Sequence, residues 1–477
     1  MGARRILTLV VCTQIASVAY ASPRSDPTTG RAVFTGATEQ SATSVTMSPA
    51  AMGLVKQLQF YFGAVATLTQ TSIDLKENDI DTGASKDAGS ANATMFAPGA
   101  DVALVWPTSD RLRVGVELHI PPPEKQIEDE SALRYHTLGG GQTTFGATVG
   151  VSFKVTGSLY LGFGVSHETS FLRLKYDRDT ALANGRGDGG VDSDCGGSPC
   201  GVGNPLAAEH YNIHARTAFV SGSNIKVTVG FMVKIASDVF LALAYHTPPG
   251  LGIQSELNGT ASIALPPRDG GGQIDTGSTV VVSYPASVDG EFRARLVHQL
   301  ELHIGGRWED LSRFSAYDVR VYGSNVIPNG IPEWQLRARG LHDSFAFWGG
   351  LEQIDTGDLI RFGARLGVET SSLTANRTSP MNVYPLALTA DVGVQFRFTP
   401  GSERRFQISY GLSYFPEVSV GNSAYDARDR LACLDNGTDY SSAACQATRA
   451  GYAIGSAAGT YDKLEHALRI GFVYDWR

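Results

Sequence analysis

The chain has 477 residues, a formal net charge of −8 and only 18% charged residues, while 54 residues are glycine. The acidic balance argues against nucleic acid or an anionic membrane surface as the partner. No stretch beyond the N-terminus approaches the roughly 18 consecutive apolar residues of a transmembrane helix, so none is predicted.

The N-terminus has the pattern of a secretory signal peptide. Arg4 and Arg5 precede an apolar run over 6–18, and residues 19–21 (Ala-Tyr-Ala) form a small-x-small cleavage site. We expect residues 1–21 to be removed. A buried helix or a membrane anchor is the alternative, but the run is shorter than the roughly 20 residues that span a bilayer.

The next segment, residues 22–53, is rich in small, uncharged residues and lacks strand-like alternation. Such a segment is unsuited to a lipid-facing strand, and we expect it to sit inside the lumen of a barrel as a hatch, or plug. The sequence thus predicts a signal peptide (1–21), a hatch (22–53) and a transmembrane β-barrel with long extracellular loops (54–477).

From residue 54 onward, apolar and polar residues alternate, which is typical of strands with one apolar face. The clearest examples are 143–155, 224–235 and 387–398. These runs exceed the roughly 5–6 residues of soluble sandwich strands and match the roughly 9–11 residues that cross a bilayer at a tilt. The predicted strands are 54–68, 98–106, 111–120, 143–155, 159–168, 224–235, 239–246, 286–297, 300–310, 341–354, 359–369, 387–398, 404–414 and 464–476.

The connections between these strands are alternately short and long, as in outer-membrane barrels with periplasmic turns and external loops. The sequence therefore predicts an all-β fold, a transmembrane antiparallel up-and-down β-barrel of about 14 strands with the hatch inside its lumen. The barrel must close because hydrocarbon offers no partner for an open strand edge. Candidates for the aromatic girdle at the membrane surfaces are Trp106, Trp308, Tyr414, Phe415 and Trp476.

Two cysteine pairs remain after the signal peptide, each inside one Gly/Ser-rich loop. Four cysteines allow three connectivities, and we expect the local disulfides Cys195–Cys200 and Cys433–Cys445, formed in an oxidising periplasm. A zinc site is the alternative, although neither pair has Cys-x₂-Cys spacing. No metal site and no cofactor are predicted elsewhere.

No recognised catalytic motif is present, and the chain is not expected to be an enzyme. His342-Asp343-Ser344 holds the residue types of an outer-membrane phospholipase, but without a recognised nucleophile context. We interpret it as an ordinary strand edge.

Several segments, in order along the chain, resemble the FadL family of outer-membrane transporters for long-chain fatty acids and aromatic hydrocarbons. The hatch of that family is Gly-x-Ala-rich and ends in Asn-Pro-Ala, with which Gly30-Arg31-Ala32 and Ser48-Pro49-Ala50 compare. The later segments that resemble the family are 114–121, 241–248, 308–314, 360–368, 380–393 and 466–474.

The resemblance implies passive transport of hydrophobic compounds, most of all long-chain fatty acids, across the outer membrane. Ligand would be captured near the external loops, bind beside the hatch, and leave sideways into the lipid through a kinked strand. The implied partners are a fatty acid or aromatic hydrocarbon, outer-membrane lipid and lipopolysaccharide, and the barrel-assembly machinery that reads the aromatic last strand.

The expected ligand or gate residues lie in the hatch, and basic residues predicted to face the lumen are candidates to pair with a ligand carboxylate. Two other functions remain open, a general diffusion porin for small polar solutes and a loop-presenting adhesin or structural barrel. The hatch residues are Gly30, Arg31, Phe34, Gly36, Met47, Ser48, Pro49 and Ala50, and the lumen cations are Arg113, Lys154, Arg361 and Arg365.

Overall fold

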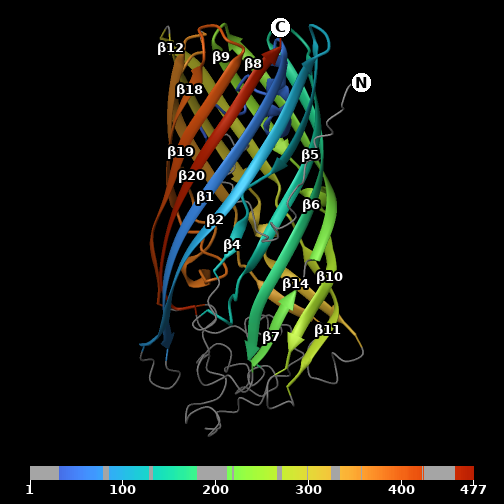
Figure 1. Cartoon of the computed structure of the whole chain (residues 1–477), viewed down its shortest axis with the longest axis vertical. Coiled ribbons are helices and arrows are strands. Elements are labelled where there is room, and N and C mark those ends of the chain that lie inside the picture. The colour runs from blue at the N-terminus through green and yellow to red at the C-terminus, as the bar shows by residue number, and fades with distance from the viewer. Residues whose placement is uncertain are drawn as a thin grey trace, which may run out of the picture.

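The computed structural model describes residues 32–78, 85–127, 133–179, 212–217, 220–265, 271–297, 299–323, 334–355, 357–421, 423 and 457–476. The described strands form one antiparallel sheet that closes on itself, because β20 pairs with β1 from Trp476 opposite Leu58 to Gly459 opposite Leu75. Figure 1 shows the resulting cylinder of long, tilted strands. The expected all-β, closed antiparallel barrel is confirmed.

The ring is defined by consecutive pairings that return to the first strand. Its strands, in ring order, are β1 (Leu58–Asn78), β2 (Ser85–Pro107), β3 (Leu112–Ile120), β5 (Gly140–Lys154), β6 (Leu159–Asp179), β8 (Val220–Ala236), β9 (Val239–His246), β12 (Ser287–Val297), β13 (Leu300–Glu309), β16 (Ser344–Gln353), β17 (Ile360–Glu369), β18 (Ala387–Arg397), β19 (Arg404–Val420) and β20 (Gly459–Trp476).

Shorter strands extend this ring on the side of the long connections. From β6, pairings continue outward in the order β7, β10, β11, β14 and β15, while β4 pairs with β5. Figure 1 places β7, β10, β11 and β14 at the end of the barrel opposite the C-terminus. These strands are β4 (Glu124–Gln126), β7 (Asn212–Thr217), β10 (Ser255–Ala264), β11 (Gln273–Val282), β14 (Ala316–Tyr322) and β15 (Trp334–Ala338).

The helical elements of the described residues are short. The first two, α1 (Ser44–Met47) and η2 (Pro49–Leu54), lie in the N-terminal segment. The others are η5 (Pro249–Gly252), η7 (Leu311–Arg313) and η9 (Ala375–Arg377). In the part of the chain that the structure describes, no helix has the length and apolar character needed to cross a membrane.

Across the ring, apolar side chains point outward and polar side chains point inward. On β3, Val116 and Leu118 are 45% and 50% exposed, whereas Glu117 between them is 1% exposed. On β5, Val149 is 54% exposed and its neighbour Thr148 is buried. This arrangement is the reverse of a water-soluble protein and places an apolar belt around a polar interior.

The polarity of the wall inverts near the long connections. On β1, Phe62 faces outward and is 44% exposed, but farther along the strand the inward residues Ile73 and Leu75 are apolar and buried. There the outward residues Asp74 and Lys76 are exposed to solvent. The pairing of β1 with β20 keeps one register from Leu58 to Leu75, so the change of chemistry marks where the surroundings of the wall change from apolar to aqueous.

This inversion explains where the predicted strand ends were wrong. The strands predicted at 54–68 and 404–414 continue to Asn78 and Val420, and part of each predicted loop is strand. The strands β7, β10, β11 and β15 also fall within predicted loops. The exposed residues of β10 and β11 include Glu256, Asn258, Gln273 and Asp275, which are polar because they meet water, so the pattern of a lipid-facing strand is absent there.

One girdle candidate is also corrected. Tyr414 is 51% exposed, whereas its neighbour Phe415 is 1% exposed and faces the interior. Adjacent residues of a strand point to opposite faces, so only one of the two can meet lipid. Trp106 and Trp476 are 62% and 41% exposed, as a girdle requires.

Candidate functional site

The N-terminal segment from residue 32 to residue 55 packs against inward-facing residues of the ring strands. Its backbone N–H groups donate to inward-facing carboxylates on β18, β16, β12 and β3, which come from different sides of the barrel. A segment rich in small residues can approach the wall closely enough for these bonds. The four bonds are Val33 to Asp391 at 3.0 Å, Phe34 to Glu352 at 3.1 Å, Ala37 to Glu291 at 3.2 Å and Thr46 to Glu117 at 3.0 Å.

Phe34 and Gly36 hold the first turn of this segment against the wall. Phe34 has a φ of 63°, a left-handed conformation that costs a non-glycine residue roughly 1–2 kcal/mol. The Arg361 guanidinium lies 4.7 Å from the centre of its ring, which offsets part of this cost. A Cβ at Gly36 would lie 2.3 Å from a Glu291 carboxylate oxygen, so this close approach requires glycine.

The second predicted motif, Ser48-Pro49-Ala50, packs against β5 and β6. Pro49 begins η2, and the Ala50 carbonyl accepts a hydrogen bond from Ser152 at 3.0 Å. A Cβ at Gly162 would lie 2.0 Å from the Ala50 nitrogen, so the segment sits directly on the wall. Met47 is buried in the same contact, and Gly30 and Arg31 lie outside the described residues.

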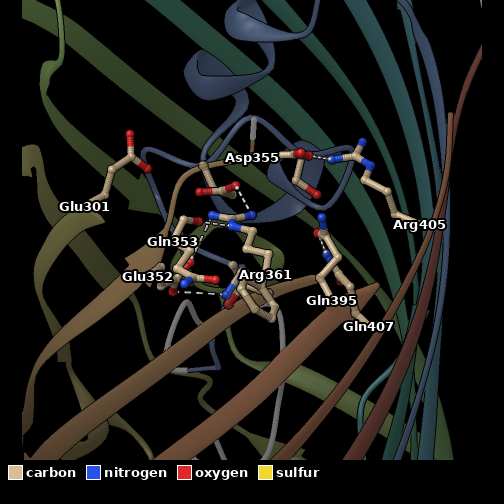
Figure 2. Close-up of polar contacts among 12 residues, drawn as sticks. Glu301, Glu352, Gln353, Asp355, Arg361, Gln395, Arg405 and Gln407 are labelled. Atoms are coloured by element: carbon tan, nitrogen blue, oxygen red, sulfur yellow. Dashed lines mark hydrogen bonds and ion pairs between the residues drawn. The ribbon is translucent and has the colours of Figure 1, made fainter. Parts of the chain in front are cut away.

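The predicted lumen cations separate into two groups. Arg361 and Arg365 both meet Glu352, at 3.4 Å and 2.5 Å, and Figure 2 shows Arg361 reaching toward it. Arg113 instead donates to the Val55 carbonyl at 2.6 Å, and Lys154 lies 5.9 Å from the Tyr160 ring. The structure therefore brings only Arg361 and Arg365 together, and their partner is a wall glutamate.

At the short-turn end, ion pairs tie neighbouring turns together. Asp355 meets Arg397 at 2.5 Å and Arg405 at 3.1 Å, and Arg405 also meets Asp475 at 2.6 Å. Figure 2 shows Asp355 and Arg405 facing one another across this end. Burial alone would raise the pKa of Asp355, but the adjacent guanidinium groups of Arg405 and Arg397 lower it to about 2.

We expect Asp355→Asn to remove a pH-dependent part of the stability. A carboxyl whose folded-state pKa is depressed stabilises the fold above its unfolded pKa of about 3.9, and this stabilisation is lost as pH falls toward the folded value. The wild type should lose about 2 kcal/mol between pH 4 and pH 2 through this group, and the variant should lack that component. Denaturant unfolding in detergent across this pH range measures it, and identical pH profiles would contradict the prediction.

A cavity of about 50 Å³ lies on the loop side of the N-terminal segment. Its wall mixes threonines, apolar side chains and three charged groups, Lys125, Lys463 and Glu465. The Lys463 ammonium lies 5.5 Å from the ring of Tyr384 and 4.8 Å from that of Phe415. The lining residues are Thr67, Thr69, Thr71, Met95, Ala97, Pro123, Lys125, Gln126, Ile127, Pro380, Met381, Val383, Tyr384, Lys463 and Glu465.

Among the described residues, one edge of β2 beside this cavity has no strand partner. β3 pairs with β2 only as far as Ile120 opposite Ala100, and Pro121-Pro122-Pro123 follows. Proline lacks the N–H that a ladder needs. Beyond it, β4 pairs with β5, and the described pairings give β2 no partner on this side before Ala100.

Sequence reasoning missed this cavity because its residues come from distant segments. The only local signal was the proline run after the third predicted strand.

The cysteine pairs Cys195–Cys200 and Cys433–Cys445 lie outside the described residues. His342 bonds the Asp343 carbonyl and Ser344 bonds Glu369, so these two side chains are not joined to each other in the structure.

A closed antiparallel barrel with an apolar exterior and a polar interior is typical of bacterial outer-membrane proteins. A family model described as "Outer membrane protein transport protein (OMPP1/FadL/TodX)" matches residues 8–336. The chain belongs to this family, and it is an outer-membrane protein of the class that transports hydrophobic compounds.

Solved structures share the fold at low sequence identity. A FadL homologue from Pseudomonas aeruginosa aligns with a TM-score of 0.72 at 14% identity, over 96% of this chain and 99% of that one. The toluene transporter TodX from P. putida aligns at 0.61 and 12% identity, over 91% and 94%. The toluene transporter TbuX from Ralstonia pickettii aligns at 0.58 and 15%, over 97% and 100%. The search of curated proteins found no match.

Proposed function

We propose that this protein is a passive channel for long-chain fatty acids, which bind in the cavity and leave sideways between β2 and β4. The observation that carries the proposal is the position of the cavity against the unpaired stretch of wall. Met95 and Ala97 line it from β2, and Pro123 and Lys125 line it from the other side of the break.

The surroundings of the break suit release into lipid. Phe96 on β2 and Ile120 at the end of β3 face outward and are 53% and 39% exposed. A Cβ at Gly99 would lie 2.7 Å from Pro122, so the two sides touch there without a ladder. Parting them breaks no backbone hydrogen bond between β2 and β4, because the described pairings contain none.

The charge of the cavity favours a carboxylate ligand. Lys125 and Lys463 face a single acid, Glu465, so the three groups leave one positive charge. A fatty-acid carboxylate neutralises that charge, and its chain gains about 0.8 kcal/mol for each CH₂ removed from water.

At about 50 Å³ the cavity holds only a few waters, so a ligand must displace side chains. Met95 and Met381 are flexible enough to move.

In this proposal the fourteen strands of the ring, β1–β3, β5, β6, β8, β9, β12, β13 and β16–β20, are the membrane-spanning strands. The N-terminal segment is the hatch that blocks the route along the barrel axis, which argues against a general diffusion porin. Its expected gate residues remain those at 30–36 and 47–50. Monoaromatic hydrocarbons are the second candidate ligands, because the similar proteins TodX and TbuX are toluene transporters.

Uptake of radiolabelled oleate and toluene tests the proposal, in cells that lack their own channel and express the full chain. We expect oleate uptake, and Lys463→Met should reduce it several-fold while leaving any toluene uptake unchanged. Lys154→Met, which alters a lysine distant from the cavity, is the matched control. Toluene uptake without oleate uptake would favour the second candidate, and large ion conductance in a planar bilayer would favour a porin.

A further inference from the structure

His303, on β13, presents an unsatisfied nitrogen to buried carboxylates. The side chain is 0% exposed, and among the described residues its Nε2 has no hydrogen-bond partner. This atom lies 3.9 Å from Glu352 Oε2 and 4.0 Å from Glu301 Oε2. Those separations exceed a hydrogen bond of 2.7–3.2 Å. Tetrahedral donors bound to one ion at about 2.0–2.1 Å lie about 3.3–3.4 Å apart, so these atoms would need to approach by only about half an ångström to share an ion.

The other nitrogen of His303 is oriented as in a metal-binding histidine. Nδ1 lies 3.2 Å from Glu291 Oε1 and 3.4 Å from an Arg365 guanidinium nitrogen. In the tautomer that donates the Nδ1 proton to Glu291, the nearer partner, the Nε2 lone pair is directed at Glu352 and Glu301. Metal-binding histidines usually donate their second N–H to a carboxylate in this way. Glu291 is itself held by the Thr38 hydroxyl and by the Ala37 N–H at 3.2 Å.

The N-terminal segment supplies another donor to the same point. Donor atoms of Glu39, His303 and Glu352 lie within 4.8 Å of one another, and all three residues are buried. We propose that Glu39, His303 and Glu352, with Glu301 beside them, bind a divalent zinc-like ion that fastens the N-terminal segment to β13 and β16. An imidazole with carboxylates suits Zn²⁺, whereas Ca²⁺ and Mg²⁺ take oxygen ligands alone.

Arginines also contact these carboxylates. Arg365 takes Glu352 Oε1 at 2.5 Å, and Arg361 lies 3.4 Å from Glu352 Oε2. Arg293 and Arg361 lie 3.4 Å and 3.8 Å from the two oxygens of Glu39, and Arg293 lies 3.8 Å from Glu301 Oε2. The three guanidinium groups do not balance the four carboxylates of Glu39, Glu291, Glu301 and Glu352. A cation at the centre supplies the missing positive charge.

No local motif marks this site, because its ligands come from three separate segments of the chain, at residue 39, at 301–303 and at 352. The site is also independent of the cavity, so its test does not depend on which compound is transported.

The test uses the full-length mature protein, purified in detergent, stripped with a chelator and dialysed against Zn²⁺. We expect about one zinc per chain by mass spectrometry, and Zn²⁺ addition should raise the unfolding temperature. His303→Gln and Glu39→Gln should each weaken zinc binding roughly tenfold or more. Glu39 is not part of the wall, so its substitution leaves the barrel strands unchanged.

His246→Gln is the matched control, since His246 is equally buried but meets Asp289 at 3.0 Å in a different part of the lumen. It should keep zinc binding at the wild-type level. Heat-dependent migration on gels shows whether each variant has folded. The proposal is overturned if the wild type holds no zinc above the chelator-treated background, or if both cluster variants bind zinc as tightly as the wild type.

Discussion

Ala97→Trp is expected to stop most uptake while leaving the barrel folded. Ala97 is 4% exposed and lines the cavity from β2, directly beside the unpaired stretch of wall. An indole ring is much larger than the methyl group it replaces, and it would fill a space of about 50 Å³. We expect uptake of the transported compound to fall at least about tenfold, because a ligand would have to displace a buried aromatic side chain worth several kcal/mol.

Phe96→Trp is the control for this result. Phe96 is the next residue on β2, but it faces outward and is 53% exposed, so an indole there meets lipid and leaves the cavity unchanged. Uptake of radiolabelled oleate by cells with equal amounts of surface protein gives the comparison. Wild-type uptake by Ala97→Trp would show that ligands do not pass through this cavity.

Arg469→Met is expected to destabilise the protein more than any surface substitution. Arg469 on β20 pairs with Asp391 on β18, and both side chains are more than nine-tenths buried. Asp391 also accepts the Val33 N–H, so the pair supports the N-terminal segment. Removing one partner leaves a buried charge without compensation, which typically costs 3–5 kcal/mol.

The double variant Asp391→Asn with Arg469→Met separates charge from packing. It removes both charges, and the asparagine amide oxygen can still accept the Val33 N–H. We expect it to recover most of the lost stability, since replacing a buried pair by neutral groups is often close to neutral. Urea unfolding in lipid vesicles, followed by tryptophan fluorescence, measures both variants. A single variant within about 0.5 kcal/mol of the wild type would contradict the prediction.

The strands could be predicted wherever the wall meets lipid. Over 143–155 and 387–398 an apolar face alternates with a polar one, and the structure has β5 and β18 there. The prediction failed beyond the apolar belt, where Asp74 and Lys76 replace apolar residues on the outward face of β1. The backbone continues unchanged because its hydrogen bonds to neighbouring strands do not depend on what surrounds the wall.

The candidate site could be predicted only in part. Phe34, Gly36 and Ser48-Pro49-Ala50 stood out because small residues without alternation are unusual ahead of a strand. Glu352 did not stand out in the sequence, because a single acidic residue on the inward face of a strand resembles any other residue that faces the lumen. The structure gives it a role through its contacts with the Phe34 N–H, Arg361 and Arg365.

From the amino-acid order we could predict an outer-membrane barrel whose strands have one face for lipid and one for a polar interior. The two faces follow from local order, since a period of two along the chain places successive residues on opposite sides of a sheet. Which inward groups meet could be seen only in the folded barrel. Closing the ring brings β1, β4, β20 and the 380–384 segment around one cavity, and it brings Glu39 to His303. Such contacts depend on how strands far apart in the chain are ordered around the cylinder, which no local pattern records.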